Sequence, residues 1–200
     1  EFLGQKLAEE HPPTDADLVT FLPRCPEIAA RAYARATNKP FSPVFYKMKS
    51  ERAFQGSTAQ ERAQSIEKNL YFLPDARKIV EGKKVIVVDD SIIRGNNSKH
   101  AKNLLMEEGG AKEMILLSYT PPIGIIGDDG TPRGCLFGVD MPPTDNFIAR
   151  GRNLEQITAA AGMQVKYLSR TGMHEVFSRL GLTDARLCTY CIGGRHPFSP

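Results

Sequence analysis

The chain has 200 residues, 41% of them hydrophobic and 24% charged, with a net charge of +3 at pH 7. That length suits one domain with a substantial core, and the composition is ordinary for a globular protein. The sequence has no apolar run long enough to cross a membrane and no signal-peptide pattern in residues 1–20, so we expect a cytoplasmic protein without a membrane partner. The small net charge predicts no nucleic-acid partner. Because the first residue is Glu rather than Met, we expect a fragment or a processed product.

Predicted helices and strands alternate along the chain. Helices are expected over 4–10, 27–37, the stretch after Ser98, 144–161 and 169–180. Strands are expected over 16–22, 44–46, 85–88, 114–118, 135–140 and 165–168. This order is typical of an α/β fold with a doubly wound, mostly parallel sheet, in which ligands bind at the carboxyl ends of the strands. We assign 1–182 to this domain and 183–200 to a Cys-containing C-terminal tail.

Residues 83–98, KKVIVVDDSIIRGNNS, carry the most chemical information. A β-branched apolar run ends in Asp89 and Asp90, and a short turn with Arg94 and Gly95 opens the next helix. A helix N-terminus offers free backbone N–H groups to a phosphate, and a glycine lets the backbone approach the anion. The two carboxylates suit ribose hydroxyls or a divalent cation. Asp-Asp-Ser alone would only end a strand and cap a helix, but all these features together favour a sugar-phosphate site.

This segment resembles the phosphoribosyl-pyrophosphate (PRPP) motif of type I phosphoribosyltransferases, which is a hydrophobic run, two acids and a short phosphate loop. The likeness covers essentially the whole chain. GQKLAEEHP, RAF at 52–54, VVDDSIIRG, the Pro pair at 121–122, CLFGVDMP and CTYCIGGRHPF follow in the order of the glutamine amidophosphoribosyltransferase family. The chain is similar to the PRPP-using half of that family, and the glutaminase half is absent from this sequence.

The resemblance implies transfer of ammonia to C1 of PRPP with loss of pyrophosphate, giving 5-phosphoribosylamine at the first step of de novo purine synthesis. Departure of pyrophosphate leaves oxocarbenium character on the ribose, so catalysis rests on positioning and charge stabilisation, with Mg²⁺ neutralising the leaving group. The expected partner is a glutaminase domain upstream. A homo-oligomer is expected for the isolated half, because its exposed face would normally pack against that domain.

The resemblance also implies roles for individual residues. Asp89 and Asp90 would orient the ribose and, directly or through water, Mg²⁺. Arg52 is the catalytic candidate at the pyrophosphate end, with Lys47 binding substrate beside it, and 55–70 matches the family's mobile loop that closes over the substrate. A solvated basic surface is the alternative for Lys47 and Arg52. The 5-phosphate would be held by Ser91, Ile92, Ile93, Arg94, Gly95, Asn96, Asn97 and Ser98.

Several positions depart from the family pattern. Arg24 and Cys25 are substrate-binding candidates in the pyrophosphate turn, where they replace an acid and a hydroxyl residue, so a thiol stands where a hydroxyl is expected near Mg²⁺. The loop before Arg52 is one residue short. Asn96 and Asn97 replace a Thr pair, a mild change because backbone N–H groups do most of the binding. These departures keep a second hypothesis open, that of a PRPP- or nucleotide-binding regulatory domain without turnover.

The sequence contains four cysteines, and a cytoplasmic setting argues against disulfides. In one branch of the family, cysteines matching Cys135, Cys188 and Cys191 hold a [4Fe–4S] cluster with a fourth cysteine, which would lie before residue 1. The role expected of such a cluster is structural, because amide transfer involves no redox step. Zinc bound by Cys188, Cys191 and His196 is one alternative, and ordinary reduced thiols are another.

Overall fold

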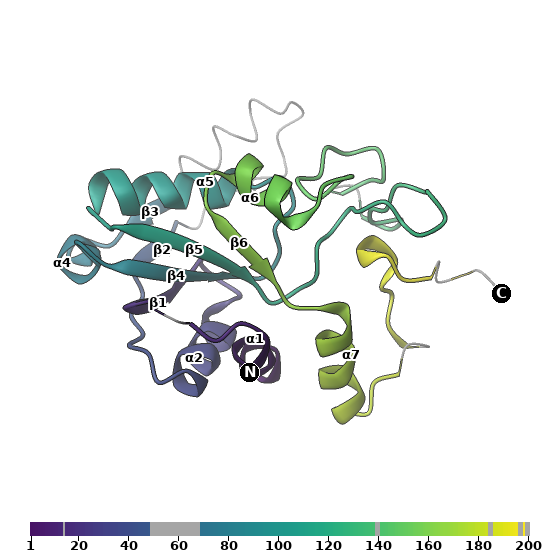
Figure 1. The fold of residues 1–200 in the computed structure, drawn as a ribbon, viewed down its shortest axis with the longest axis horizontal. Coiled ribbons are helices and arrows are strands. Elements are labelled where there is room, and N and C mark those ends of the chain that lie inside the picture. The colour runs from purple at the N-terminus through teal and green to yellow at the C-terminus, as the bar shows by residue number, and fades with distance from the viewer. Residues whose placement is uncertain (14, 49–68, 139–140, 184–185, 196–197, 199–200) are drawn as a thin grey trace.

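The computed structural model describes residues 1–13, 15–48, 69–138, 141–183, 186–195 and 198. Its centre is a parallel sheet of four strands in the order β1-β4-β5-β6 (Figure 1). The strands are β1 (Leu18–Phe21), β4 (Lys84–Asp89), β5 (Glu113–Ser118) and β6 (Gln164–Tyr167). Val88 pairs with Phe21 and with Leu117, and Ser118 pairs with Tyr167. The carboxyl ends of all four strands therefore meet at one edge of the sheet.

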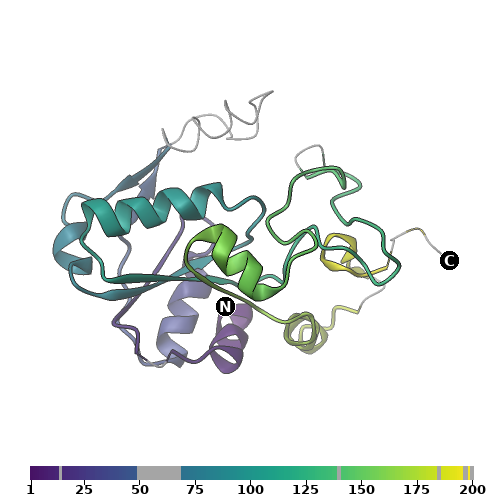
Figure 2. The same ribbon diagram turned by 45° about the horizontal axis from the view of Figure 1, so that its top comes forward.

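Helices cover both faces of the sheet, which confirms the predicted doubly wound α/β fold (Figure 2). One face packs against α1 (Phe2–Glu10), α2 (Glu27–Ala36) and α7 (Arg170–Arg179). The other face packs against α4 (Ala76–Val80), α5 (Asn96–Asn103) with its π-helical continuation η1 (Leu104–Glu108), and α6 (Leu154–Ala161). β4 supplies alternate side chains to the two cores, as the period of two along a strand requires.

A small antiparallel pair stands apart from the main sheet. It consists of β2 (Phe45–Lys47) and β3 (Leu70–Phe72). Phe45 is buried in the core and its ring lies 5.7 Å from that of Phe72, whereas Tyr46 faces outward and stacks on Tyr71 at 5.3 Å. The strand predicted over 44–46 is therefore present, but it does not belong to the parallel sheet. The sequence did not predict β3 or α4.

One predicted strand is absent from the described residues, and one predicted helix is present only in its second part. Cys135–Gly138, the described part of the strand expected over 135–140, contains no strand. Instead, the Cys135 N–H donates to the Met141 carbonyl at 2.7 Å, and the Gly138 N–H donates to Cys135 Sγ at 3.1 Å, which closes a tight loop.

The helix expected over 144–161 begins only at Leu154. Asn153 starts it with a capping box, because its side chain accepts from the Gln156 N–H while the Gln156 side chain accepts from the Asn153 N–H. Residues 144–153 form turns instead, and Gly151 there has a φ of 63°. Arg150 stabilises this irregular stretch by donating to the carbonyls of Gly124, Pro143 and Arg133.

The tail packs against the domain. Its short 3-10 turn, η3 (Tyr190–Ile192), has both of its ends buried, and Ile192 joins the core on the α1 side of the sheet. The Gly124 N–H donates to the Cys191 carbonyl at 2.8 Å. Among the described residues, no helix has the length and apolar character needed to cross a membrane.

Candidate functional site

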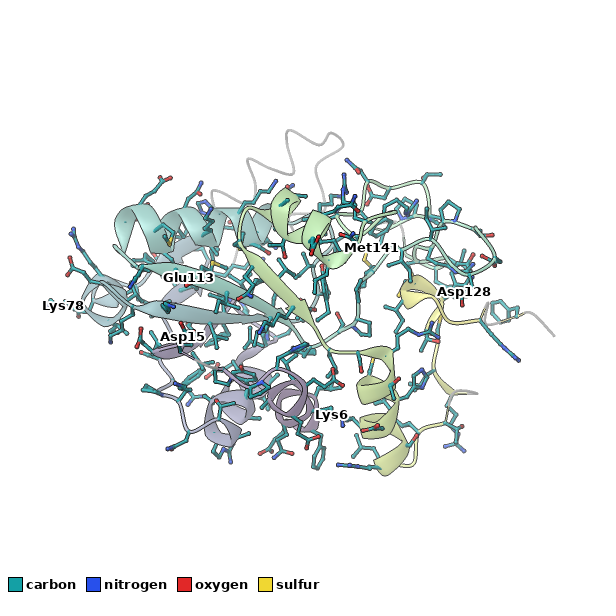
Figure 3. The ribbon with its side chains drawn as sticks, viewed as in Figure 1. Lys6, Asp15, Lys78, Glu113, Asp128 and Met141 are labelled. Carbon is teal, nitrogen blue, oxygen red and sulfur yellow. The ribbon has the colours of Figure 1, made fainter. Side chains whose placement is uncertain are left out.

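The carboxyl edge of the sheet gathers the residues that the sequence singled out. Arg24 and Cys25 follow β1, Asp89 ends β4 with Asp90 directly after it, and Tyr119 follows β5. Because parallel strands end together at this edge, segments distant in sequence meet there. The opposite edge holds Lys84, paired with Asp15 and, at 3.5 Å, with Glu113 (Figure 3).

Asp89 is a buried acid, with 8% of its surface exposed. Burial raises the pKa of its carboxyl well above the ordinary 3.8, and the neighbouring charge of Asp90 raises it further. The opposing influences are weaker: the Asp90 N–H donates to Asp89 Oδ1 at 2.9 Å, and the charge of Lys47 also lowers the pKa. The site therefore holds an acid that is costly to ionise without a cation or hydroxyl donors to complement it.

Asp90 is half-buried. Among the described residues its carboxylate has one side-chain contact, a long one of 3.5 Å from Ser91 Oγ. Tyr119 lies near enough to both acids and to Cys25 that their charges, after the larger effect of burial, raise the pKa of its phenol to about 12. Tyr119 therefore stays protonated at neutral pH and can donate a hydrogen bond at the mouth of the site.

The turn after the acids fits an anion. Gly95 caps α5 in the left-handed conformation, with φ of 81°, and its carbonyl accepts the Lys99 N–H at 2.9 Å. Within the described part of the chain, no acceptor is recorded for the backbone N–H groups of 96–98, which begin the helix. A Cβ on Gly95 would lie 2.9 Å from Cδ1 of Ile148, so the turn is also packed tightly from behind.

The side chains of the turn have different surroundings. Ile92 is buried in the core on the α5 side of the sheet, and Ile93 packs against the core on the α1 side. These two residues can therefore offer a ligand only their backbone. Ser98 is buried, Asn96 is half-buried and Asn97 is exposed. Phosphate binding here would accordingly depend on main-chain N–H groups more than on side chains.

Arg94 makes an ion pair that the sequence did not predict. Its guanidinium contacts both carboxylate oxygens of Asp145, with Nε 3.3 Å from Oδ1. The Ile148 N–H donates to the Ile93 carbonyl at 2.8 Å. The segment after residue 144 thus holds the turn in place, and Arg94 is engaged with the protein rather than pointing only toward a ligand.

Basic groups border the acid pair on the β2 side. Lys47 ends β2 and is half-buried, and its charge acts on Asp89. The exposed Arg24 donates to the Lys47 carbonyl at 3.4 Å, so the turn after β1 lies next to the antiparallel pair of β2 and β3. The Pro23–Arg24 peptide bond is cis, and Cys25 is exposed beside it. Arg52 and the segment 55–68 lie outside the described residues.

Three cysteines approach one another at the tail. Burial raises the pKa of the Cys191 thiol, and the charges of Cys188 and Cys135 add to that effect. Among the described residues, however, no three His, Cys, Asp or Glu side chains converge closely enough to hold a metal ion. His196, the third ligand of the zinc alternative, lies outside the described residues.

A separate hollow of about 500 Å³ lies between the loop before Cys135 and the tail. Asp128, which is labelled in Figure 3, is one of its lining residues. Its buried Arg133 already pairs with Asp129 at 3.0 Å and covers the ring of Tyr190 at 4.5 Å. These contacts fasten the tail to the loop. The acids and the open helix N-terminus lie elsewhere, so the carboxyl edge of the sheet is the better candidate site.

Comparisons with known proteins show which proteins the chain resembles. No family model matches the chain. Amidophosphoribosyltransferases of Methanothermobacter thermautotrophicus and Synechococcus elongatus are each 30% identical to it over 98% of its length. That of Mycobacterium tuberculosis is 31% identical over the same share. The chain is homologous to the C-terminal, phosphoribosyltransferase part of amidophosphoribosyltransferases.

The chain spans only 38%, 37% and 35% of these three amidophosphoribosyltransferases. Two solved structures each superpose on 98% of it with a TM-score of 0.76. One is the glutamine PRPP amidotransferase of B. subtilis in complex with ADP and GMP, 31% identical, of which the chain covers 41%. The other is described as the allosteric regulatory enzyme of purine biosynthesis, 30% identical and covered to 40%. The family resemblance and the phosphoribosyltransferase fold are thereby confirmed.

Sequence reasoning missed the groups that support the acids from β5. These are Ser118, Tyr119 and Thr120, together with Asp145 behind the turn. A signal was available for the first three, since they follow directly on a strand expected to lie in the same sheet. The sequence contained no signal for Asp145. Its partner Arg94 is 51 residues away, and the stretch around Asp145 was expected to be helical.

Proposed function

We propose that this chain binds PRPP and transfers ammonia to its C1, releasing pyrophosphate and forming 5-phosphoribosylamine. The reaction would be the first step of de novo purine synthesis, with a glutaminase domain of a longer protein supplying the ammonia. The observation that carries the proposal is the placement of the buried Asp89 and the half-buried Asp90 shortly before a helix N-terminus whose N–H groups have no recorded acceptor in the described part of the chain.

The turn would hold the 5-phosphate. The backbone N–H groups at the start of α5 have no recorded acceptor in the described part of the chain, and the positive end of the helix dipole favours a phosphate there. The left-handed Gly95 makes this close approach possible, because a side chain at that position would be both strained and crowded. Fixing the phosphate at one end of the ribose places the other end over the acid pair.

The acids would orient the ribose. Two hydroxyls of the sugar are donors that complement Asp89 and Asp90, and such hydrogen bonds favour the charged form of a carboxyl whose pKa burial has raised. Mg²⁺ suits oxygen ligands of this kind and, when bound, would neutralise the departing pyrophosphate. Binding of substrate and cation is therefore expected to ionise Asp89, which is unfavourable in the free protein.

Lys47 and Arg24 would meet the pyrophosphate end. Both are cationic, and they lie together beside the acid pair. As pyrophosphate leaves C1, cations on its side and carboxylates under the ribose stabilise the separating charges without a covalent intermediate. Tyr119, whose raised pKa keeps it protonated, would offer a phenol donor near the acids.

The decisive experiment measures pyrophosphate release from PRPP with Mg²⁺ and excess ammonia. Loss of release in Asp89→Ala and Asp90→Ala, with activity retained in Asp75→Ala, would support the proposal. Asp75 is a suitable control because it is exposed and, among the described residues, its recorded ion pair is with the exposed Lys78 at 3.0 Å. Absence of PRPP binding by the unaltered chain would refute it.

A regulatory domain that binds PRPP or a nucleotide without turnover is the second candidate. It is favoured by the exposed thiol of Cys25 in the turn beside the acids, where the family resemblance leads one to expect a hydroxyl. Binding of PRPP by calorimetry together with no release of pyrophosphate would select this candidate. Restored release in Cys25→Thr would then trace the loss of turnover to that thiol.

We further propose that Cys135, Cys188 and Cys191 are three ligands of a structural [4Fe–4S] cluster. The electrostatic influence of Cys188 and Cys135 on the Cys191 thiol supports it, and the N–H of Gly138 donates to Cys135 Sγ. Within the described residues the three thiols do not converge closely enough to hold a metal ion, so cluster binding would have to draw them together and add a fourth ligand. Iron and sulfide analysis after anaerobic purification tests this, with Cys25→Ser as a control that should retain the cluster and Cys188→Ser as the variant that should lose it.

A further inference from the structure

The backbone around the acid pair is held by a network from the end of β5. The Tyr119 N–H donates to the Asp89 carbonyl at 3.2 Å, and Thr120 Oγ1 donates to the Asp90 carbonyl at 2.8 Å. Together with the bond from the Asp90 N–H to Asp89 Oδ1, these contacts engage both polar groups of the peptide that joins the two acids and the carbonyl of the next peptide. The Asp90 carboxylate is left to face the site.

The Thr120 hydroxyl is itself oriented by a buried neighbour. Ser118 has no exposed surface, and its Oγ lies 3.1 Å from Thr120 Oγ1 and accepts the Thr120 N–H at 3.3 Å. Each hydroxyl has one hydrogen to donate. Thr120 Oγ1 is nearer to the Asp90 carbonyl than Ser118 Oγ is, at 2.8 against 3.4 Å, so Thr120 is the donor to Asp90. Ser118 Oγ also lies 3.0 Å from the Thr120 carbonyl, to which it can donate, so the buried Ser118 holds Thr120 through both its main chain and its hydroxyl.

The carboxylate of Asp90 has little other support. Within the described residues its one side-chain contact, with Ser91 Oγ, is 3.5 Å long, which is at the limit of a hydrogen bond. The main chain of Asp90, which fixes the position of Cβ, therefore contributes most to where the carboxylate lies. The bond from Thr120 to the Asp90 carbonyl opposes movement of that main chain.

We propose that Thr120 is a positioning residue for Asp90, and that its hydroxyl fixes the carboxylate in the orientation that receives the ribose and Mg²⁺. This inference rests on the proposed function and deepens it. Thr120 would touch neither substrate nor cation. Its effect would pass through the Asp90 carbonyl, as outer-shell partners act on the ligands of metal sites.

The test compares Thr120→Val, Thr120→Ser and Thr37→Val in calorimetric titrations with Mg²⁺–PRPP and in pyrophosphate release. Valine keeps the shape of threonine and removes the donor, whereas serine keeps the donor. Thr37 is the matched control: it is half-buried, and its hydroxyl also donates to a backbone carbonyl at 2.8 Å, that of Tyr33. It lies at the far end of α2, about 15 Å along the helix from the turn after β1.

Thr120→Val is expected to weaken Mg²⁺–PRPP binding by about 10-fold or more, as loss of an outer-shell partner typically does. Thr120→Ser should restore it, and Thr37→Val should bind like the unaltered chain. Ser118→Ala should shift binding in the same direction by a smaller factor, which keeps the inference testable should Thr120→Val fold poorly.

Equal affinity of Thr120→Val and the unaltered chain would overturn the inference while leaving the proposed function intact. Weakened binding in Thr120→Val that Thr120→Ser does not restore would overturn it too, because the methyl group and not the hydroxyl would then matter. If the unaltered chain binds no Mg²⁺–PRPP, the proposed function itself fails and the inference falls with it.

Discussion

Replacing Asp89 by Asn should stabilise the free protein. In the folded chain the carboxyl is 8% exposed, and within the described residues it accepts one recorded hydrogen bond, from the Asp90 N–H, although a carboxylate can accept about four. An Asn side chain can keep that bond through its Oδ1 and carries no charge to repel Asp90. Removing a poorly compensated buried charge is worth about 1–3 kcal/mol, and we expect a gain of that order at pH 7.5.

The gain should depend on pH with a definite sign. Because the folded pKa of Asp89 is raised, the native chain keeps the proton in a range where the unfolded chain, with a pKa near 3.8, has released it. The stability of the unaltered protein therefore falls as the pH rises from about 3.8 through the folded pKa. Asp89→Asn has no carboxyl at this position and does not lose this stability. The difference in free energy of unfolding between the two proteins should therefore grow over that pH range and reach its full value above it.

Urea unfolding at several pH values measures the free energy of unfolding of both proteins. Asp75→Asn is the exposed control, and its free energy of unfolding should lie within about 0.5 kcal/mol of that of the unaltered chain. Mg²⁺–PRPP at 100 times its Kd should stabilise the unaltered chain by about 2.7 kcal/mol and Asp89→Asn hardly at all. A less stable Asp89→Asn at pH 7.5, or a difference that does not change with pH, would refute the reasoning.

Gly95→Ala should destabilise the protein by roughly 1–2 kcal/mol in urea unfolding, from left-handed strain and the contact with Ile148, and should weaken PRPP binding; unchanged binding would argue against the turn as the phosphate site. Asp145→Asn should cost about 1–3 kcal/mol, because it removes the charged partner of the half-buried Arg94. Tyr167→Phe should leave stability unchanged or raise it by about 1 kcal/mol, because the Tyr167 hydroxyl is buried without a recorded partner among the described residues; a large loss would contradict this.

Sequence patterns predicted the central sheet well because its signals are local. The run before Asp89 is apolar on both faces of the strand, and such a run occurs where helices cover a sheet on both sides. The strand at 114–118 and the helix capped by Ser169 carry equally clear signals, and the structure contains both. The convergence of Asp89 with the turn after β1 followed from the parallel topology alone.

The parts that escaped prediction depend on distant contacts. Cys135–Gly138 has an apolar character that suits a strand, but the bond from Cys135 to Met141 makes it a loop. Residues 144–153 contain enough apolar side chains to suggest a helix, yet Arg150 stabilises an irregular path by donating to three carbonyls. Neither the Arg94–Asp145 pair nor the Thr120–Asp90 bond has a pattern in sequence, because both depend on the fold being formed.

Strand β4 leaves little freedom for insertions or deletions. Val85 and Val87 belong to one core, and Ile86 and Val88 to the other. One residue added or lost within this strand would exchange the two sets and turn the Asp89 side chain to the opposite layer, so both cores and the acid pair would be disrupted by the same event. Gaps in alignments with distant homologues therefore belong outside Lys84–Asp89, and changes in chain length that preserve the fold are expected in the surface connections instead.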